Sequence, residues 1–127
     1  MPQAQPLNTD PHKILAEKLA KPGEQIVSEM TPLKAHLMHM AIGVSGEAGE
    51  LLDAIKKHVM YGKELDVENV IEELGDIYFY IQGIMNGLGL ERDQIIQHNI
   101  RKLSKRYSAG TYSNEQAQER ADKEEGQ

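Results

Sequence analysis

A helical periodicity of apolar residues through the middle of the sequence constrains the fold more than any other feature. Between residues 31 and 60, apolar side chains recur at spacings of three and four, as on one face of an α-helix. Thr31-Pro32 supplies a cap followed by proline at the first helical position, and Tyr61-Gly62 ends the run. A long helix is therefore predicted, with the stripe Leu33, Leu37, Met40, Val44, Ala48, Leu51, Ile55 and Val59.

Further segments carry the same signals. Asp66 caps a predicted helix over about 67–87, and a turn at 87–89 leads to another over about 91–107. Asp10-Pro11 opens a shorter helix over 12–20, and residues 24–30 can add one or two turns. No segment shows sustained alternation of period two, so the fold class is predicted to be all-α, a four-helix bundle. The stripe of the 67–87 helix is Val70, Leu74, Ile77, Ile81, Ile84 and Leu88.

The 127 residues are the length of one domain. Residues 1–9 and 113–127 are polar and are predicted to be flexible tails around a helical domain at 10–112, with disorder from about Ser113. The absence of cysteine excludes disulfides and thiolate metal sites. With no signal-peptide pattern and no apolar run long enough for a bilayer, we expect a soluble, cytoplasmic protein without a membrane partner.

Two features of the long helix point to close neighbours. The segment 37–44 is apolar nearly all round, which is typical of a helix buried on several sides. A chain this small achieves such burial best by self-association, so a homo-oligomer, a dimer or tetramer, is predicted. Gly43, Gly46 and Gly49 each cost about 1 kcal/mol relative to alanine inside a helix, which suggests a close approach of another backbone.

The charge is segregated. Residues 47–76 contain nine acids and three lysines, and this window carries the whole net charge of −6. Such a field repels nucleic acid, which is therefore not an expected partner. Four cations follow within six residues, namely Arg101, Lys102, Lys105 and Arg106.

Four of the acids form a pattern. Glu47-x-x-Glu50 and Glu73-x-x-Asp76 lie on consecutive predicted helices, at the edge of each apolar stripe. If the stripes pack together, these carboxylates converge, raise one another's pKa, and favour a hard divalent cation such as Mg²⁺. The alternative is a solvated acidic face, offset by the neighbouring lysines. Glu72 is an alternative to Glu73 as a ligand, although it points further from the stripe.

The cations admit two interpretations as well. Asn99, Lys102 and Arg106 share one face of the last predicted helix. They form either a charged solvent face near a helix C-terminus or a phosphate clamp opposite the metal site.

The segment Gly46-Glu47-Ala-Gly49-Glu50-Leu51-Leu-Asp53-Ala-Ile55-Lys56-Lys57, followed by Glu72-Glu73-Leu-Gly75-Asp76-Ile-Tyr-Phe, resembles the MazG family. These are all-α nucleoside triphosphate pyrophosphohydrolases, related to the dimeric dUTPases and the dCTP pyrophosphatases. The later stretch Lys102-Leu-Ser-Lys105-Arg106-Tyr107 is similar to a third-helix motif of that family. The resemblance spans about 35–112 and implies a MazG-like helical bundle.

The resemblance also implies an activity and its residues. The bond between the α- and β-phosphates of a nucleoside triphosphate would be hydrolysed, with Mg²⁺ (or Mn²⁺) held by Glu47, Glu50, Glu73 and Asp76. Glu50 and Glu47 would be catalytic, with Glu50 as the candidate proton acceptor. Substrate would be bound by Lys57, Tyr80, Asn99, Lys102 and Arg106. Two alternatives stay open: a phosphoribosyl-ATP pyrophosphohydrolase, and a non-catalytic acidic helical interaction protein.

Overall fold

The computed structural model describes residues 10–124, which divide into two compact units with the boundary between Ala35 and His36. Every regular element in this range is a helix, so the all-α prediction is confirmed. The seven helices of the described range are α1 (Pro11–Leu19), α2 (Gly23–Glu29), α3 (Pro32–Tyr61), α4 (Val67–Leu88), α5 (Arg92–Arg106), α6 (Asn114–Glu119) and α7 (Ala121–Glu124). The predicted N-terminal tail, residues 1–9, lies outside the described residues.

The N-terminal unit contains α1 and α2. The Asp10 carboxylate caps α1 by accepting hydrogen bonds from the backbone N–H groups of His12 and Lys13, at 3.0 and 3.3 Å. Glu29, near the end of α2, forms an ion pair with Lys21, and Lys34 donates to its carbonyl at 3.1 Å. The predicted one or two turns at 24–30 are therefore a helix.

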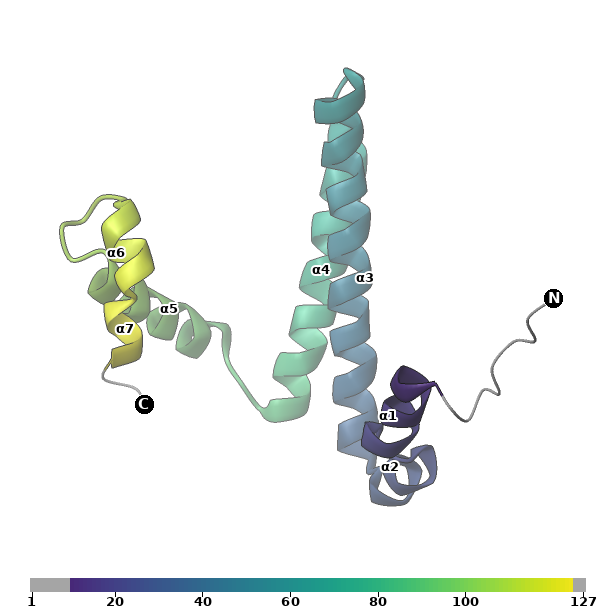
Figure 1. Cartoon of the computed structure of the whole chain (residues 1–127). Helices are drawn as coiled ribbons and strands as arrows, with labels where there is room; N and C mark the ends of the chain where they lie inside the picture. The colour runs from purple at the N-terminus through teal and green to yellow at the C-terminus, as the bar shows by residue number, and fades with distance from the viewer. Residues whose placement is uncertain (1–9, 125–127) are drawn as a thin grey trace. The chain divides into compact units, whose positions relative to one another are not determined.

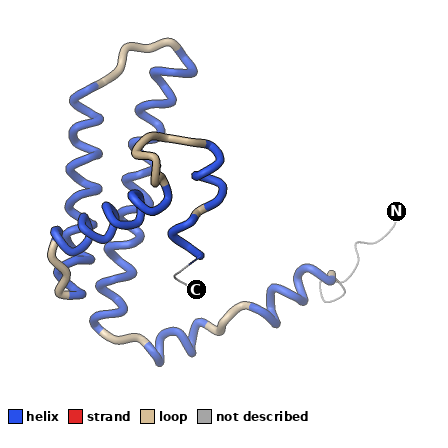
Figure 2. Tube along the Cα trace, turned by 90° about the vertical axis from the view of Figure 1, so that its left-hand side faces the viewer, coloured by secondary structure: helices blue, strands red, loops and turns tan. Residues whose placement is uncertain are grey.

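The second unit is built around a hairpin of α3 and α4, which run side by side in opposite directions (Figure 1). Figure 2 shows the loop at residues 62–66 that joins them at one end. Gly62 lies in the left-handed region with φ 65°, and Asp66 caps α4 by accepting from the Asn69 N–H at 3.0 Å. Gly89, with φ 66°, ends α4 in a left-handed cap. The sequence signals for these boundaries are thus confirmed.

Two glycines let the hairpin helices approach closely. A Cβ atom added to Gly43 would overlap the ring of Tyr80, and one added to Gly83 would overlap the Met40 side chain. His36 adds a polar link, because its Nε2 lies 2.7 Å from the Gly83 carbonyl oxygen and donates to it. A close neighbour is therefore found at Gly43, but it is the Tyr80 side chain and not the predicted backbone, and a Cβ at Gly46 or Gly49 would meet no described atom within 4 Å.

The C-terminal helices correct one prediction. Disorder was expected from about Ser113, but the structure has α6 and α7 there, and α5 contacts both. Arg106 of α5 pairs with Asp122 of α7 at 2.8 Å, and the rings of Tyr107 and Tyr112 lie 5.8 Å apart. The composition argument considered apolar area alone, so it missed an ion pair that holds a polar segment in place.

The hairpin contact covers the apolar stripes only in part. On α4, Tyr80 and Gly83 meet α3 to one side of the stripe, while the stripe residues Val70, Ile77 and Ile84 are half-buried. Among the described residues, only Met40, Ala54 and Met85 are buried hydrophobic residues. The contact is therefore offset to one side of the two stripes, and part of each stripe stays exposed. No helix within residues 10–124 has the length and apolar character needed to cross a bilayer.

We expect these open apolar faces to be covered by self-association. Ile42, Leu52 and Tyr78 are 63%, 68% and 66% exposed, and a soluble protein rarely leaves so many large apolar side chains in water. Light scattering at micromolar concentration should give at least twice the chain mass of 14.2 kDa. A mass of one chain would contradict the prediction.

The contact at Gly43 predicts that alanine substitutions at two glycines of α3 change the stability in opposite directions. Gly43→Ala should lower the free energy of unfolding by about 1–3 kcal/mol, because the new methyl group forces Tyr80 out of place. Gly49→Ala is the matched control: a Cβ there meets no described atom within 4 Å, so alanine should add up to about 1 kcal/mol through helix propensity. Urea unfolding at fixed protein concentration measures both. Equal stability of the two variants would refute the close contact.

Candidate functional site

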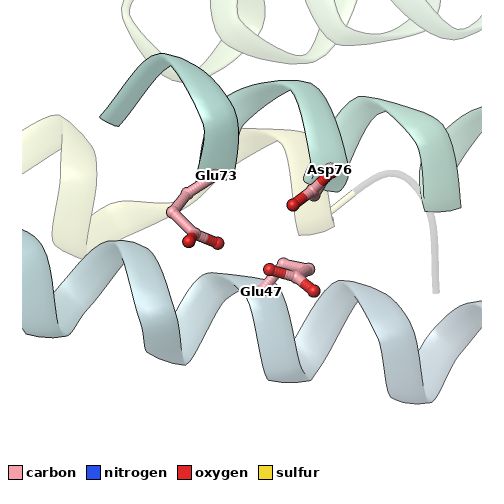
Figure 3. Close-up of side chains that lie close together, drawn as sticks. All are labelled: Glu47, Glu73 and Asp76. Carbon is pink, nitrogen blue, oxygen red and sulfur yellow. The ribbon is translucent and has the colours of Figure 1, made fainter. Parts of the chain in front are cut away.

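Three carboxylates from the two hairpin helices converge. Glu47 of α3 faces Glu73 and Asp76 of α4, and one oxygen of each lies within 4.8 Å of the others. Figure 3 shows the three side chains pointing toward one another between the two ribbons. Glu47 and Glu73 are half-buried, whereas Asp76 is exposed. Two of the three acids are thus partly withdrawn from water although they carry like charges.

The glycine contacts set the register that brings these acids together. Gly43 opposes Tyr80, and Met40 opposes Gly83. In both pairs the two residue numbers add to the same total, as expected for antiparallel helices of equal rise. One turn beyond Gly43 on α3 is Glu47, and one turn before Tyr80 on α4 is Asp76. The convergence of the acids therefore follows from the contact that the glycines permit.

Glu73 is the electrostatic focus of the group. Its pKa is raised to about 7, first because its carboxyl hydrogen-bonds that of Glu47, then by burial and by the negative charges of Glu47, Glu50 and Asp76. Its Oε2 atom is buried and has no hydrogen-bond partner among the described residues. A buried carboxylate oxygen without a partner is costly, so either a proton or a cation should accompany it.

A divalent cation fits this donor set. Oxygen atoms from carboxylates are the ligands that Mg²⁺ prefers, and the unpartnered Oε2 of Glu73 is available to one. On a fully solvated acidic face this Glu73 oxygen would be exposed to water, whereas here it is buried. Glu72, the alternative ligand, is exposed and lies outside the group.

Glu50 lies at the margin of the group. It is exposed and is not among the three converging acids, although its charge contributes to the raised pKa of Glu73. By the register of the hairpin it is opposite Glu73, one turn from Glu47. An exposed carboxylate beside the acidic group is well placed to exchange protons with water.

The predicted substrate-binding residues of the hairpin differ in their surroundings. Tyr80 packs against Gly43 and lies edge-on to Phe79 and His39, one turn from Asp76. Lys57 is engaged within its own helix, because its Nζ lies 2.8 Å from an Asp53 carboxylate oxygen. This ion pair lowers the pKa of Asp53 and raises that of Lys57.

The predicted substrate-binding residues of α5 also lie in different surroundings. Asn99 is exposed, and Lys102 lines a cavity of about 410 Å³ next to α7. Arg106 donates from Nε to Asp122 Oδ1 at 2.8 Å and from Nη2 to Oδ2 at 3.3 Å. The two side chains are only 17% and 5% exposed, so Arg106 is committed to Asp122. Sequence reasoning missed Asp122 because no periodic apolar pattern marks its segment.

Comparisons with known proteins match the part of the chain that contains the hairpin and α5. The family model described as "MazG nucleotide pyrophosphohydrolase domain" matches residues 36–110, which include the hairpin from His36 on and α5. The chain is similar to "Gene 37 protein" of Mycobacterium phage L5, with 32% identity over 79 residues, 58% of this chain and 68% of that protein. No solved structure matches the chain.

The raised pKa of Glu73 predicts a pH dependence of stability. Between the ordinary value of 4.5 and about 7, the folded protein keeps a proton that the unfolded chain releases, so stability should fall as pH rises through this window. The melting temperature of the metal-free protein should therefore be lower at pH 8 than at pH 5. Glu73→Gln should remove most of this difference, whereas Glu72→Gln, the exposed neighbour, should keep it. If the melting temperature of Glu73→Gln depended on pH as strongly as that of the unchanged protein, the predicted crowding of carboxylates around Glu73 would be absent.

Proposed function

Because the chain belongs to the MazG nucleotide pyrophosphohydrolase domain family, we propose that it hydrolyses (deoxy)nucleoside triphosphates between the α- and β-phosphates. The products would be a nucleoside monophosphate and pyrophosphate. The observation that carries the proposal is the convergence of Glu47, Glu73 and Asp76 within 4.8 Å, with a buried, unpartnered oxygen on Glu73. A polyanionic substrate requires cations, and this acidic group is where the hairpin is suited to hold one.

Glu47, Glu73 and Asp76, with Glu50 one turn from Glu47, would hold Mg²⁺, for which Mn²⁺ can substitute. When bound, such a cation neutralises phosphate oxygens and lowers the pKa of a bound water. The Glu73 carboxyl would lose its proton as the cation binds, because the charge that keeps its pKa near 7 is then offset.

The remaining residues would divide the other tasks. Glu50, exposed beside the group, would accept the proton of the attacking water, and Glu47 would position that water. Tyr80 lies one turn from Asp76 and offers an aromatic edge near the site. Lys102 and Asn99 would meet the outer phosphates, whereas Lys57 would first have to exchange its Asp53 partner. Arg106, held by Asp122, would act through the position of α7 rather than by direct contact.

Two other functions are outcomes of the same test. Phosphoribosyl-ATP contains the same phosphate bond, so it belongs in the substrate panel. A non-catalytic interaction protein would use the exposed apolar faces, and it would turn over no nucleotide at all.

The experiment is a substrate panel with a matched set of variants. Each nucleoside and deoxynucleoside triphosphate, and phosphoribosyl-ATP, is incubated with the protein and Mg²⁺, and the products are resolved. We expect a monophosphate and pyrophosphate, and no turnover after chelation. Glu50→Gln and Glu47→Gln should each lower kcat by about 100-fold or more, while Glu68→Gln, an exposed acid on α4, should not.

A protein that turns over no triphosphate would overturn the proposal. Turnover that persists in Glu47→Gln and Glu50→Gln would retain the activity but reject the site. Turnover of phosphoribosyl-ATP alone would replace the proposed substrate class.

A further inference from the structure

A cavity of about 580 Å³ lies at the C-terminal end of α5, beside the segment 107–112 that leads toward α6. Its volume falls within the range of about 300–1,000 Å³ that is typical of small-molecule sites. The lining side chains are those of Leu103, Ser104, Tyr107, Ser108, Thr111 and Tyr112, and Gly110 completes the wall. The cavity is distinct from the acidic group of the hairpin, whose three residues do not line it.

The lining of this cavity is aromatic and carries hydroxyl groups but no charge. None of the described residues that form it is acidic or basic. The rings of Tyr107 and Tyr112 lie 5.8 Å apart and are tilted by 38°. Aromatic rings favour a further flat ring, and serine and threonine hydroxyls both donate and accept hydrogen bonds. The cavity therefore suits a neutral, planar molecule with polar atoms on its edge, and it does not suit an anion.

Tyr112 offers a ring face that is held in place although it is open to solvent. The residue is 72% exposed. Its hydroxyl donates a hydrogen bond to Oδ1 of Asn114, and its ring lies against that of Tyr107. A side chain that is fixed before a ligand arrives loses little conformational entropy when the ligand stacks on it.

Hydrogen bonds within the chain fix the other walls of the cavity. Gly110 has φ 78°, a conformation that glycine adopts readily, and its N–H donates to the Tyr107 carbonyl oxygen at 2.9 Å. Gln116 of α6 donates from Nε2 to Ser108 Oγ at 2.9 Å, and the Ser108 hydroxyl keeps its own hydrogen to donate. The cavity is therefore formed before any ligand binds.

Tyr80, the aromatic residue next to the acidic group, offers less open ring surface than Tyr112. It is half-buried, its ring fills the space over Gly43, and it lies edge-on to Phe79 and His39. The sequence contains no tryptophan that could serve instead. A flat ligand thus finds a better stacking surface at Tyr112.

We propose that this cavity binds a nucleobase, which stacks on Tyr112 and forms hydrogen bonds through its edge with the hydroxyls of Ser104 and Thr111. The choice of a nucleobase among flat rings rests on the proposed function, in which the substrates are nucleotides. The base is either that of the substrate or that of a second nucleotide, because both present the same ring.

The test uses nucleosides, which carry a base but no phosphate, so that no cation at the acidic group is needed. Adenosine, guanosine, cytidine, uridine and thymidine are each titrated with the full chain in metal-free buffer, and the NMR signals of the base protons are followed. For at least one nucleoside we expect saturable ring-current shifts that do not change with salt, because no ion pair forms. Ribose alone should not bind.

Three variants test the position of the base. Tyr112→Leu should weaken nucleoside binding about tenfold, because it removes the stacking ring and keeps an apolar side chain. Tyr112→Phe should keep binding within about twofold, because the ring remains. Tyr61→Leu is the matched control, since Tyr61 is 62% exposed at the end of α3 and its loss should leave binding unchanged.

Four results would overturn the proposal: no nucleoside binds, ribose binds as tightly as the nucleosides, Tyr61→Leu weakens binding as much as Tyr112→Leu, or Tyr112→Leu lowers the mass measured by light scattering. The last result would show that the cavity holds part of a second copy of the chain.

Kinetics identify the source of the base if triphosphates are turned over. A raised KM with unchanged kcat in Tyr112→Leu assigns the cavity to the base of the substrate. Unchanged kinetics together with weakened nucleoside binding assign it to a second nucleotide. If no triphosphate is turned over, the proposed function fails, and the nucleoside titration still decides whether the cavity binds a base.

Discussion

The close approach of α3 and α4 is the contact on which the rest of the second unit depends. It exists because Gly43 and Gly83 have no side chains where Tyr80 and Met40 must lie, and because His36 donates to the Gly83 carbonyl oxygen. Packed at these points, the helices have little freedom to slide. The acids one turn further on are therefore forced together, although their mutual repulsion alone would separate them.

The same contact decides what the hairpin leaves uncovered. A contact centred on glycines and acids is displaced around each helix from the apolar stripe, so Leu74 and Ile81 remain 42% and 37% exposed. The hairpin thus brings its charged residues together and leaves much of its apolar surface exposed. Chemistry and assembly would draw on different faces of the same two helices.

The sequence predicts the hairpin well because its signals are local. The caps at Asp66 and Gly89 and the three-and-four periodicity of α3 and α4 each depend on neighbours within a turn or two. Glu47, Glu73 and Asp76 are predicted together by the same periodicity. The offset of the contact is not predicted, because it depends on which glycine meets which side chain across the hairpin. The role of Asp122 is also missed, since a single long-range ion pair leaves no trace in a periodic pattern.

The register of the hairpin also bears on how the chain can vary in length. The loop at 62–66 connects the helices but does not align them, because the alignment is made at Gly43 and Gly83. Insertions in that loop would lengthen the connection and leave the acids opposed. A single insertion between Gly43 and Glu47 would turn Glu47 by about 100° around the helix and away from Asp76. Divergent sequences with this hairpin should therefore differ freely in the loop and keep one turn of fixed length between the glycine and the acid.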